Sequence, residues 1–145
     1  MREIHRSALV PYGADEMFGL VNDCESYPDF LPWCRDADVQ VVSEEEQEVS
    51  LEFARSGLHR RFTTFNRLDP GRSIRMELVN GPFRELNGQW TFHPLGDQGS
   101  KVALDLRFQF ASRLLEGVFA PVFAEVMASL VDAFVTRAHE LHGHA

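Results

Sequence analysis

The sequence predicts an α+β fold in which a curved antiparallel sheet of about six or seven strands wraps around a long C-terminal helix. Two observations support this prediction. Between residues 37 and 110, apolar and polar residues alternate, which is typical of strands with one buried face. Over the last third of the chain, apolar residues recur at spacings of three and four, as in an amphipathic helix. The chain of 145 residues is expected to form a single domain, residues 1–145.

The N-terminal part is expected to form one strand followed by short helical structure. Residues 3–10 make the first strand, and a proline and a glycine end it. Asp15 is a suitable N-cap for a short helix, because its carboxylate can accept a hydrogen bond from an unpaired backbone N–H. An irregular, proline-broken stretch follows at residues 25–34. The apolar face of the short helix is expected to hold Met17, Leu20 and Val21.

The middle of the chain is expected to form a meander of strands joined by short turns. Turn-forming residues, such as Asp69-Pro70-Gly71 and Asn80-Gly81-Pro82, separate the alternating segments. Alternation with one buried face indicates an antiparallel sheet. The residues expected on the buried face are Val39 and Val41, then Val49, Leu51 and Phe53, then Ile74, Met76 and Leu78, and finally Val102, Leu104, Leu106, Phe108 and Phe110.

The C-terminal third is expected to form the long helix. Its apolar face runs from Phe119 to Leu141, and Pro121 starts or kinks it because a proline inside a helix removes a backbone hydrogen bond. Gly143 is a suitable end of the helix. A curved antiparallel sheet closed by a long amphipathic helix is a helix-grip arrangement.

Composition and charge exclude several classes of protein. The formal net charge of −8 repels a phosphate backbone, so we expect no DNA partner. Cys24 and Cys34 form neither a disulfide framework nor a zinc-binding spacing, which favours the reducing cytoplasm. The sequence contains neither a signal-peptide pattern nor a run near the ~20 apolar residues of a membrane helix. We therefore expect a cytoplasmic protein.

Catalytic and metal-binding motifs are missing from the sequence. No glycine-rich loop opens a helix after a strand, and no nucleophile elbow frames a serine. His139 and His142 have the i, i+3 spacing of a metal site, with His144 close by. We interpret them as a solvated helix end whose charges suit the helix dipole. The protein is thus expected to be no enzyme and to hold no cofactor and no metal.

Aromatic residues are the most informative feature of the composition. The chain has twelve Phe and two Trp, many of them in residues 25–34 and on the expected concave face of the sheet. A sheet that bends away from a helix leaves space between them, and aromatic-lined pockets of about 300–1,000 Å³ are typical small-molecule sites. We therefore expect a cavity for a lipophilic ligand. Its expected lining is Phe30, Leu31, Trp33, Phe53, Met76, Leu86, Trp90, Phe92, Phe108, Phe123 and Met127.

One short segment is basic. Arg55, Arg60 and Arg61 lie close together in the sequence around the turn Ser56-Gly57, which predicts a positively charged hairpin tip. Such a tip can contact phosphates, lipid head groups or a partner protein. We nevertheless interpret it first as an exposed charged turn that contacts nothing in particular, with such a contact as the alternative.

Three sequence blocks resemble a known family. They are MFGLVND with ESYPDFLPWC (residues 17–23 and 25–34), GPFRELNGQWTF (residues 81–92) and AFVTRA (residues 133–138). Together they resemble the coenzyme Q-binding START-like proteins of the polyketide cyclase/START (SRPBCC) superfamily. That family includes the bacterial ribosome association toxin RatA proteins. The resemblance implies a helix-grip START-like ligand-binding domain with a cavity between sheet and C-terminal helix.

The resemblance implies three functions. The first is a carrier or chaperone that binds ubiquinone or a related isoprenoid quinone and supports respiration, with transient contact to the surface of the inner membrane. The second is a RatA-type toxin that binds the large ribosomal subunit and blocks subunit association, for which the hairpin tip would supply the contact. The third is an aromatase or cyclase enzyme, which requires inward polar groups such as Thr64 or Asn66. We expect the first of these functions.

Overall fold

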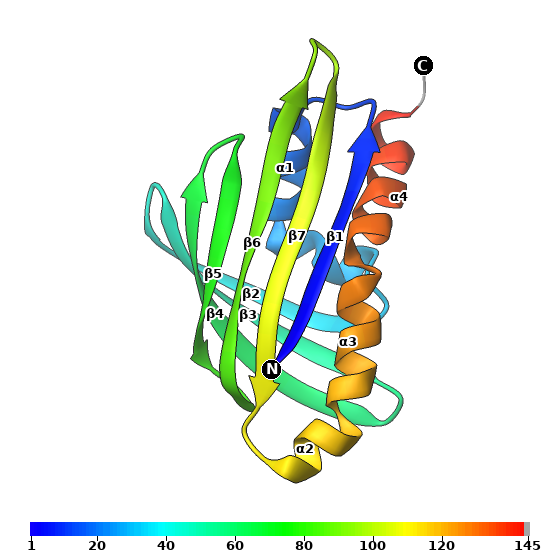
Figure 1. Ribbon diagram of the computed structural model, residues 1–145. Coiled ribbons are helices and arrows are strands. Elements are labelled where there is room, and N and C mark those ends of the chain that lie inside the picture. The colour runs from blue at the N-terminus through cyan, green and yellow to red at the C-terminus, as the bar shows by residue number, and fades with distance from the viewer. Residues whose placement is uncertain (144–145) are drawn as a thin grey trace.

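The computed structural model describes residues 1–143 and contains a seven-stranded antiparallel sheet that curves around the C-terminal helices (Figure 1). The strand order is β1-β7-β6-β5-β4-β3-β2, so every neighbouring pair except β1 and β7 is consecutive in the chain. This arrangement confirms the predicted fold class. The elements are β1 (Arg2–Val10), α1 (Ala14–Asn22), the 3-10 helix η1 (Cys24–Asp29), β2 (Cys34–Ser43), β3 (Glu46–Arg55), β4 (Leu58–Asp69), β5 (Ser73–Asn80), β6 (Phe83–Leu95), β7 (Gly99–Phe110), α2 (Arg113–Val118), α3 (Ala120–Ala128) and α4 (Leu130–His142).

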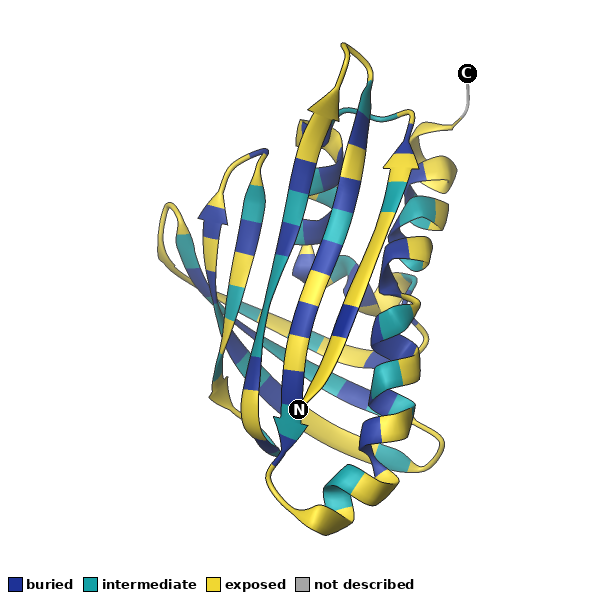
Figure 2. Cartoon of the chain, viewed as in Figure 1, coloured by how far each residue is buried: buried dark blue, intermediate teal, exposed yellow. Residues whose placement is uncertain are grey.

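Alternation of side chains gives the sheet one buried and one exposed face (Figure 2). In β7 every second residue from Val102 to Phe110 is buried, and its neighbours face outward. The pairing of β6 with β7 places Trp90 opposite Leu104 and Leu86 opposite Phe108, so these residues share the concave face. The concave face therefore carries the core, as the alternation predicts.

β2 departs from the predicted alternation. Val39 is half-buried, whereas Val41 is 77% exposed, so the expectation that Val41 is buried is wrong. The reason is the position of β2 at the edge of the sheet, where it pairs with β3 alone. At an edge strand, an apolar residue can lie beyond the cover of the helices.

The short helix α1 begins earlier than predicted. Gly13, and not Asp15, is the N-cap, and its carbonyl oxygen accepts a hydrogen bond from the Met17 N–H at 3.1 Å. Asp15 lies in the first turn, where a negative charge suits the helix dipole. Met17 and Val21 are buried as expected, and Leu20 is half-buried.

The C-terminal helix is bent into consecutive segments that run beside β1 (Figure 1). Pro121 lies in the first turn of α3, which agrees with its predicted role as a helix start. A second interruption separates α3 from α4 at Ser129. There the Ser129 N–H donates to the Val126 carbonyl at 3.1 Å, and the Ser129 hydroxyl donates to the same oxygen at 2.7 Å. These i→i−3 bonds tighten the turn and change the course of the helix.

Two aromatic clusters fill the space between sheet and helices. The α3 cluster, which includes rings of that helix, consists of Trp33, Phe53, Phe62, Phe83, Phe108, Phe110, Phe119 and Phe123. The α4 cluster consists of Phe18, Tyr27, Phe30, Trp90, Phe92 and Phe134. Among the described residues, no ring contact joins one cluster to the other.

Candidate functional site: an interior chamber between two aromatic clusters

An interior chamber of about 70 Å³ lies where the two aromatic clusters fail to meet. Met127 at the end of α3 and Leu130 at the start of α4 both border it, so the interruption at Ser129 lies beside the chamber. The volume holds a few water molecules and is well below the ~300 Å³ of a typical small-molecule pocket. The chamber is lined by Cys24, Tyr27, Trp33, Val49, Leu51, Phe62, Thr64, Asn66, Met76, Leu86, Trp90, Leu104, Leu106, Phe123, Met127, Leu130 and Phe134.

The chamber contains one pair of hydrogen-bonded polar side chains. The Thr64 hydroxyl donates to Asn66 Oδ1 at 2.7 Å, and both residues are buried on the concave face of β4. The Tyr27 hydroxyl donates to the Val21 carbonyl and thereby joins η1 to α1. All remaining lining side chains are apolar, sulfur-containing or indole groups.

The titratable groups of the chamber stay protonated at neutral pH. Burial raises the pKa of the Cys24 thiol to about 12. Burial likewise raises the pKa of the Tyr27 hydroxyl well above its ordinary value. Neither group therefore supplies a base or a nucleophile near pH 7.

The structure brings together six of the eleven predicted lining residues around the chamber. They come from four elements or loops: the η1–β2 loop, β5, β6 and α3. Whether they bind a ligand stays a prediction. The six are Trp33, Met76, Leu86, Trp90, Phe123 and Met127.

The other five predicted lining residues lie away from the chamber. Phe53 and Phe108 are fully buried inside the α3 cluster, packed against Phe123 with ring centroids 5.5 and 4.9 Å away. Phe92 packs on Phe18 at 5.6 Å. Leu31 borders an outer groove. The alternation in the sequence indicates which face these side chains share, but it contains no information on where along that face the helix makes contact.

Phe30 is the fifth of these residues and lies at the outer side of the α4 cluster. Its ring packs edge-to-face against Tyr27 and Phe134, with centroids 6.2 and 5.5 Å away. The Arg137 guanidinium lies over the same ring, 4.9 Å from its centroid. This cation–π contact ties η1 and its C-cap, Phe30, to α4.

Sequence reasoning missed much of the lining contributed by β3, β4 and η1. Thr64 and Asn66 of β4 were expected only as inward polar groups of an enzyme, and Phe62, which alternates with them, could have been found by the same period of two. Cys24 and Tyr27 precede the strands and carry no periodic signal. Their place in the chamber depends on how η1 folds back against β2.

Trp33 separates the chamber from an outer groove of about 550 Å³. The groove lies between the η1–β2 loop, the end of β3 and the α3–α4 junction. Trp33 borders both spaces and is only 6% exposed. Besides Trp33, the groove is lined by Leu31, Pro32, Ala54, Arg55, Ser129 and Ala133.

The predicted basic hairpin tip is largely neutralised by ion pairs. Arg55 lies 3.5 Å from Glu125 of α3, and Arg61 lies 3.1 Å from Asp36 of β2. Arg60 donates to the His59 carbonyl at 2.9 Å and forms no ion pair with any described carboxylate. Of the three arginines, Arg60 is therefore the one without an ion-pair partner among the described residues.

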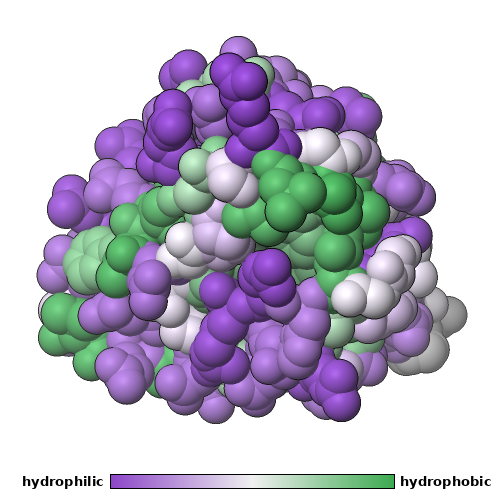
Figure 3. All heavy atoms as spheres, turned by 90° about the horizontal axis from the view of Figure 1, so that it is seen from below, coloured by the Kyte–Doolittle hydropathy of each residue, from purple (hydrophilic) through white to green (hydrophobic). Residues whose placement is uncertain are grey.

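The end of the molecule that carries α2 presents an apolar surface (Figure 3). Leu114 and Val118, one helical turn apart, are 74% and 53% exposed. Figure 3 shows green hydrophobic patches bordered by hydrophilic side chains at this end. In the part of the chain that the structure describes, no helix is long and apolar enough to cross a membrane.

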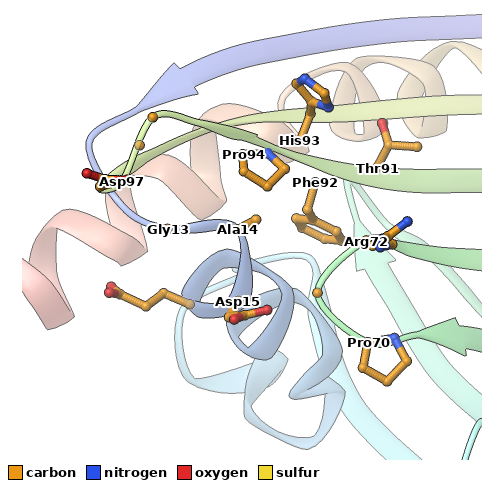
Figure 4. Close-up of a pocket in the computed structure, with 14 residues that line it drawn as sticks. Gly13, Ala14, Asp15, Pro70, Arg72, Thr91, Phe92, His93, Pro94 and Asp97 are labelled. Carbon is orange, nitrogen blue, oxygen red and sulfur yellow. The ribbon is translucent and has the colours of Figure 1, made fainter.

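A larger hollow of about 770 Å³ lies open to solvent at the far end of the sheet (Figure 4). It lies between the start of α1, the β4–β5 turn and the β6–β7 turn. Its side chains carry mixed charge, with Asp15 and Asp97 beside Arg72 and His93. Of the predicted site residues, Phe92 alone reaches it.

The C-terminal histidines do not gather into a metal site within residues 1–143. Instead, the Tyr12 hydroxyl and His139 Nδ1 form a hydrogen bond of 2.6 Å, and the His142 ring packs 5.9 Å from that of Tyr12. No group of three or more metal-ligating side chains occurs among the described residues. His144 lies outside the described residues.

A family model described as "Polyketide cyclase / dehydrase and lipid transport" matches residues 10–135. The chain belongs to this family. Its predicted family resemblance is thereby confirmed. The ribosome association toxin RatA of Pseudomonas aeruginosa is 47% identical over 140 residues, covering 97% of each chain. RatA of Escherichia coli K12 is 40% identical over 142 residues, covering 98% of this chain and 90% of that protein.

A more distant relative has a different name. The mitochondrial coenzyme Q-binding protein COQ10 homolog B of Xenopus laevis is 26% identical over 145 residues. The match covers 97% of this chain and 59% of that protein. Both names anticipated by the sequence blocks thus occur among the relatives, and the RatA proteins are much more similar.

Solved structures of other proteins share the fold. The protein CC1736 of Caulobacter crescentus has a TM-score of 0.77 at 32% identity, with 99% of both chains covered. The Zhui aromatase/cyclase of Streptomyces sp. R1128 has a TM-score of 0.80 at 18% identity, covering 95% of this chain and 93% of that one. At this lower identity the likeness concerns the fold alone.

Proposed function

We propose that this chain is a RatA-type ribosome association toxin that binds the large ribosomal subunit in the cytoplasm and blocks subunit association. Its 47% identity to a RatA protein over 97% of both chains is the observation that supports this most strongly. The proposal replaces the quinone carrier as the first choice, since the quinone-binding relative is only 26% identical.

We further propose that the toxin acts by occupying a surface and not by catalysis. The interior chamber holds only about 70 Å³, and its thiol and phenol stay protonated near neutral pH. The Thr64–Asn66 pair contains no group that ionises. Blocking of subunit joining needs only a bound protein at the contact between the subunits, so the outer surface is the relevant part of the molecule.

The charge of the molecule limits how it contacts the ribosome. The segment 36–52 of the β2–β3 hairpin holds seven carboxylates and no Lys or Arg, so it repels RNA phosphates. At the hairpin tip, Glu125 and Asp36 already hold Arg55 and Arg61. Few phosphate contacts are therefore available, and protein contacts are expected to contribute to the association.

Sucrose-gradient sedimentation with purified large ribosomal subunits tests the proposal. We expect the protein to migrate with the large subunit at low salt and to reduce joining when small subunits are added. If Arg60 alone contacts a phosphate, a plot of the logarithm of the association constant against the logarithm of the salt concentration should have a slope near −1. Three phosphate contacts would give a slope of about −2 to −3. Arg60→Gln should lower the slope, while Arg75→Gln, an exposed arginine of β5, serves as control. Absence of co-migration at low salt would refute the proposal.

As a second function, we propose that the chamber binds a small apolar ligand. The aromatic lining of the space between the two clusters supports this, together with the presence of a coenzyme Q-binding relative. Ubiquinone or a related isoprenoid quinone is the ligand expected from the sequence. A ligand of that size needs a larger space than 70 Å³. Met76 and Met127 border the chamber, and flexible methionine side chains can repack to enlarge it.

Solvent extraction followed by mass spectrometry tests this second function. The protein is purified from a quinone-containing host, extracted and compared with a Trp33→Phe variant. Co-purified quinone in stoichiometric amount would support quinone binding and would place the membrane surface among the sites the protein visits. Absence of lipid, together with no binding of added quinone, would exclude the quinone.

A further inference from the structure

Asn66 offers the chamber an unused hydrogen-bond donor. The residue is only 4% exposed and borders the chamber from β4. Its Oδ1 accepts the hydroxyl proton of Thr64 at 2.7 Å. Its amide nitrogen Nδ2 forms no hydrogen bond with any residue between 1 and 143. Two N–H donors of this amide therefore remain without an acceptor in a mainly apolar space.

The amide nitrogen faces free volume and is not sealed by protein atoms. Arg137 Nε is the one described side-chain nitrogen or oxygen that is both completely enclosed and unpaired. Asn66 Nδ2 is also unpaired, but it is not completely enclosed, so free space lies next to it. The chamber is the interior space that Asn66 borders, and the donors are therefore available to a molecule inside it.

The indole N–H groups of Trp33 and Trp90 are the other donors that border the chamber, so the Asn66→Leu variant has to show which donor the ligand uses, whereas the strand neighbours of Asn66 do not compete. On the paired strand, Gln47 lies opposite Asn66, but Gln47 Nε2 already donates to Asn22 Oδ1 at 3.0 Å, outside the chamber lining. On the other side, Met76 lies opposite Asn66 and offers no donor. A buried donor without a partner is unfavourable, and a ligand acceptor removes that cost.

We infer that Asn66 determines which ligands the chamber accepts, by donating a hydrogen bond to a carbonyl or similar acceptor oxygen on a compact apolar molecule. The inference rests on the proposed binding of an apolar ligand and adds its chemical class. An apolar molecule without an acceptor leaves the amide unpaired, so it binds more weakly. Once the methionines at the chamber wall, Met76 and Met127, move to enlarge it, the limited volume favours a molecule of about one ring over a long chain.

Two probes of equal shape test this assignment. Acetophenone carries a carbonyl oxygen where α-methylstyrene has a CH₂ group, and neither needs ionisation to bind. Isothermal titration of the wild-type chain should give about twofold to tenfold tighter binding of acetophenone, the range of one neutral hydrogen bond. In proton–nitrogen NMR spectra, the Asn66 side-chain amide should shift with acetophenone and much less with α-methylstyrene.

Asn66→Leu should abolish the preference, since leucine has a similar volume and no donor. Gln47→Leu is the matched control, because it removes an equally buried amide that does not border the chamber, and it should keep the preference. Equal binding of both probes to the wild-type chain, or a preference that survives in Asn66→Leu, would overturn the role of Asn66 and leave ligand binding intact. Failure of both probes to bind would overturn ligand binding by the chamber as well. The wild-type comparison decides the question even if Asn66→Leu fails to fold.

Discussion

Replacement of valine by isoleucine, made separately at Val49 and at Val102, tests for free space inside the protein. Both are buried valines on strands, but Val49 borders the chamber and Val102 does not. An empty volume of 70 Å³ corresponds to about 1.7 kcal/mol of lost packing at ~24 cal/mol per Å³. One added methylene contributes up to ~0.8 kcal/mol when it fills such space. We therefore expect Val49→Ile to raise the free energy of unfolding by about 0.5–1 kcal/mol.

The same substitution at Val102 should change the free energy of unfolding in the opposite direction. Val102 is fully buried, so an extra methylene forces its neighbours apart and should lower the free energy of unfolding by about 1–3 kcal/mol. Urea unfolding followed by tryptophan fluorescence measures both, since Trp33 and Trp90 are both buried at the chamber. Val49→Ile should also weaken acetophenone binding. Equal destabilisation by the two variants would mean that no usable space exists beside Val49, and the chamber argument would fail.

Three further outcomes follow from single contacts. Phe123→Ala should lower the free energy of unfolding by about 3–5 kcal/mol in chemical denaturation, because the ring is the centre of the α3 cluster; a loss below about 1 kcal/mol would contradict this packing. Ser112→Ala should cost about 1 kcal/mol in the same assay, since its hydroxyl caps α2 by accepting the Leu115 N–H. The hydrogen bond to Asp105 raises the pKa of His5 above 6.5. The stabilising effect of this bond is therefore complete below pH 6.5 and is lost as the pH rises through the folded-state pKa. NMR titration should find the His5 pKa lowered in Asp105→Asn and unchanged in a variant far from His5.

The regular parts of the fold were predictable from local patterns alone. The alternation from Val102 to Phe110 matches a strand whose concave face is buried along its whole length. Pro121 marks the start of α3 because its missing N–H is tolerated in a first helical turn. The interruption at Ser129 was not predictable, because the apolar spacing of three and four from Phe123 to Phe134 continues through it. Its bond to the Val126 carbonyl ends α3 there, and no helix-breaking residue announces it.

The candidate site was predictable only in part, because periodicity gives the face of a residue and not its depth under the helices. Phe108 and Leu106 alternate on the same strand face, yet Leu106 borders the chamber and Phe108 packs within the α3 cluster. The difference depends on where Phe123 meets the sheet. Likewise, the three arginines of the hairpin tip are close in sequence, but their partners Glu125 and Asp36 come from distant segments.

The two aromatic clusters limit what the interior can do. A long isoprenoid chain lying along the helices would have to displace rings of the α3 cluster such as Phe53 and Phe119, which are almost fully buried and mutually packed at 5.2 Å. A compact ligand needs only the methionines at the chamber wall to move. A chain of several isoprene units would therefore have to leave the interior past Trp33, through the outer groove. An interior that is mostly solid, with a small chamber at the helix interruption, suits a protein whose main contact is made by its outer surface.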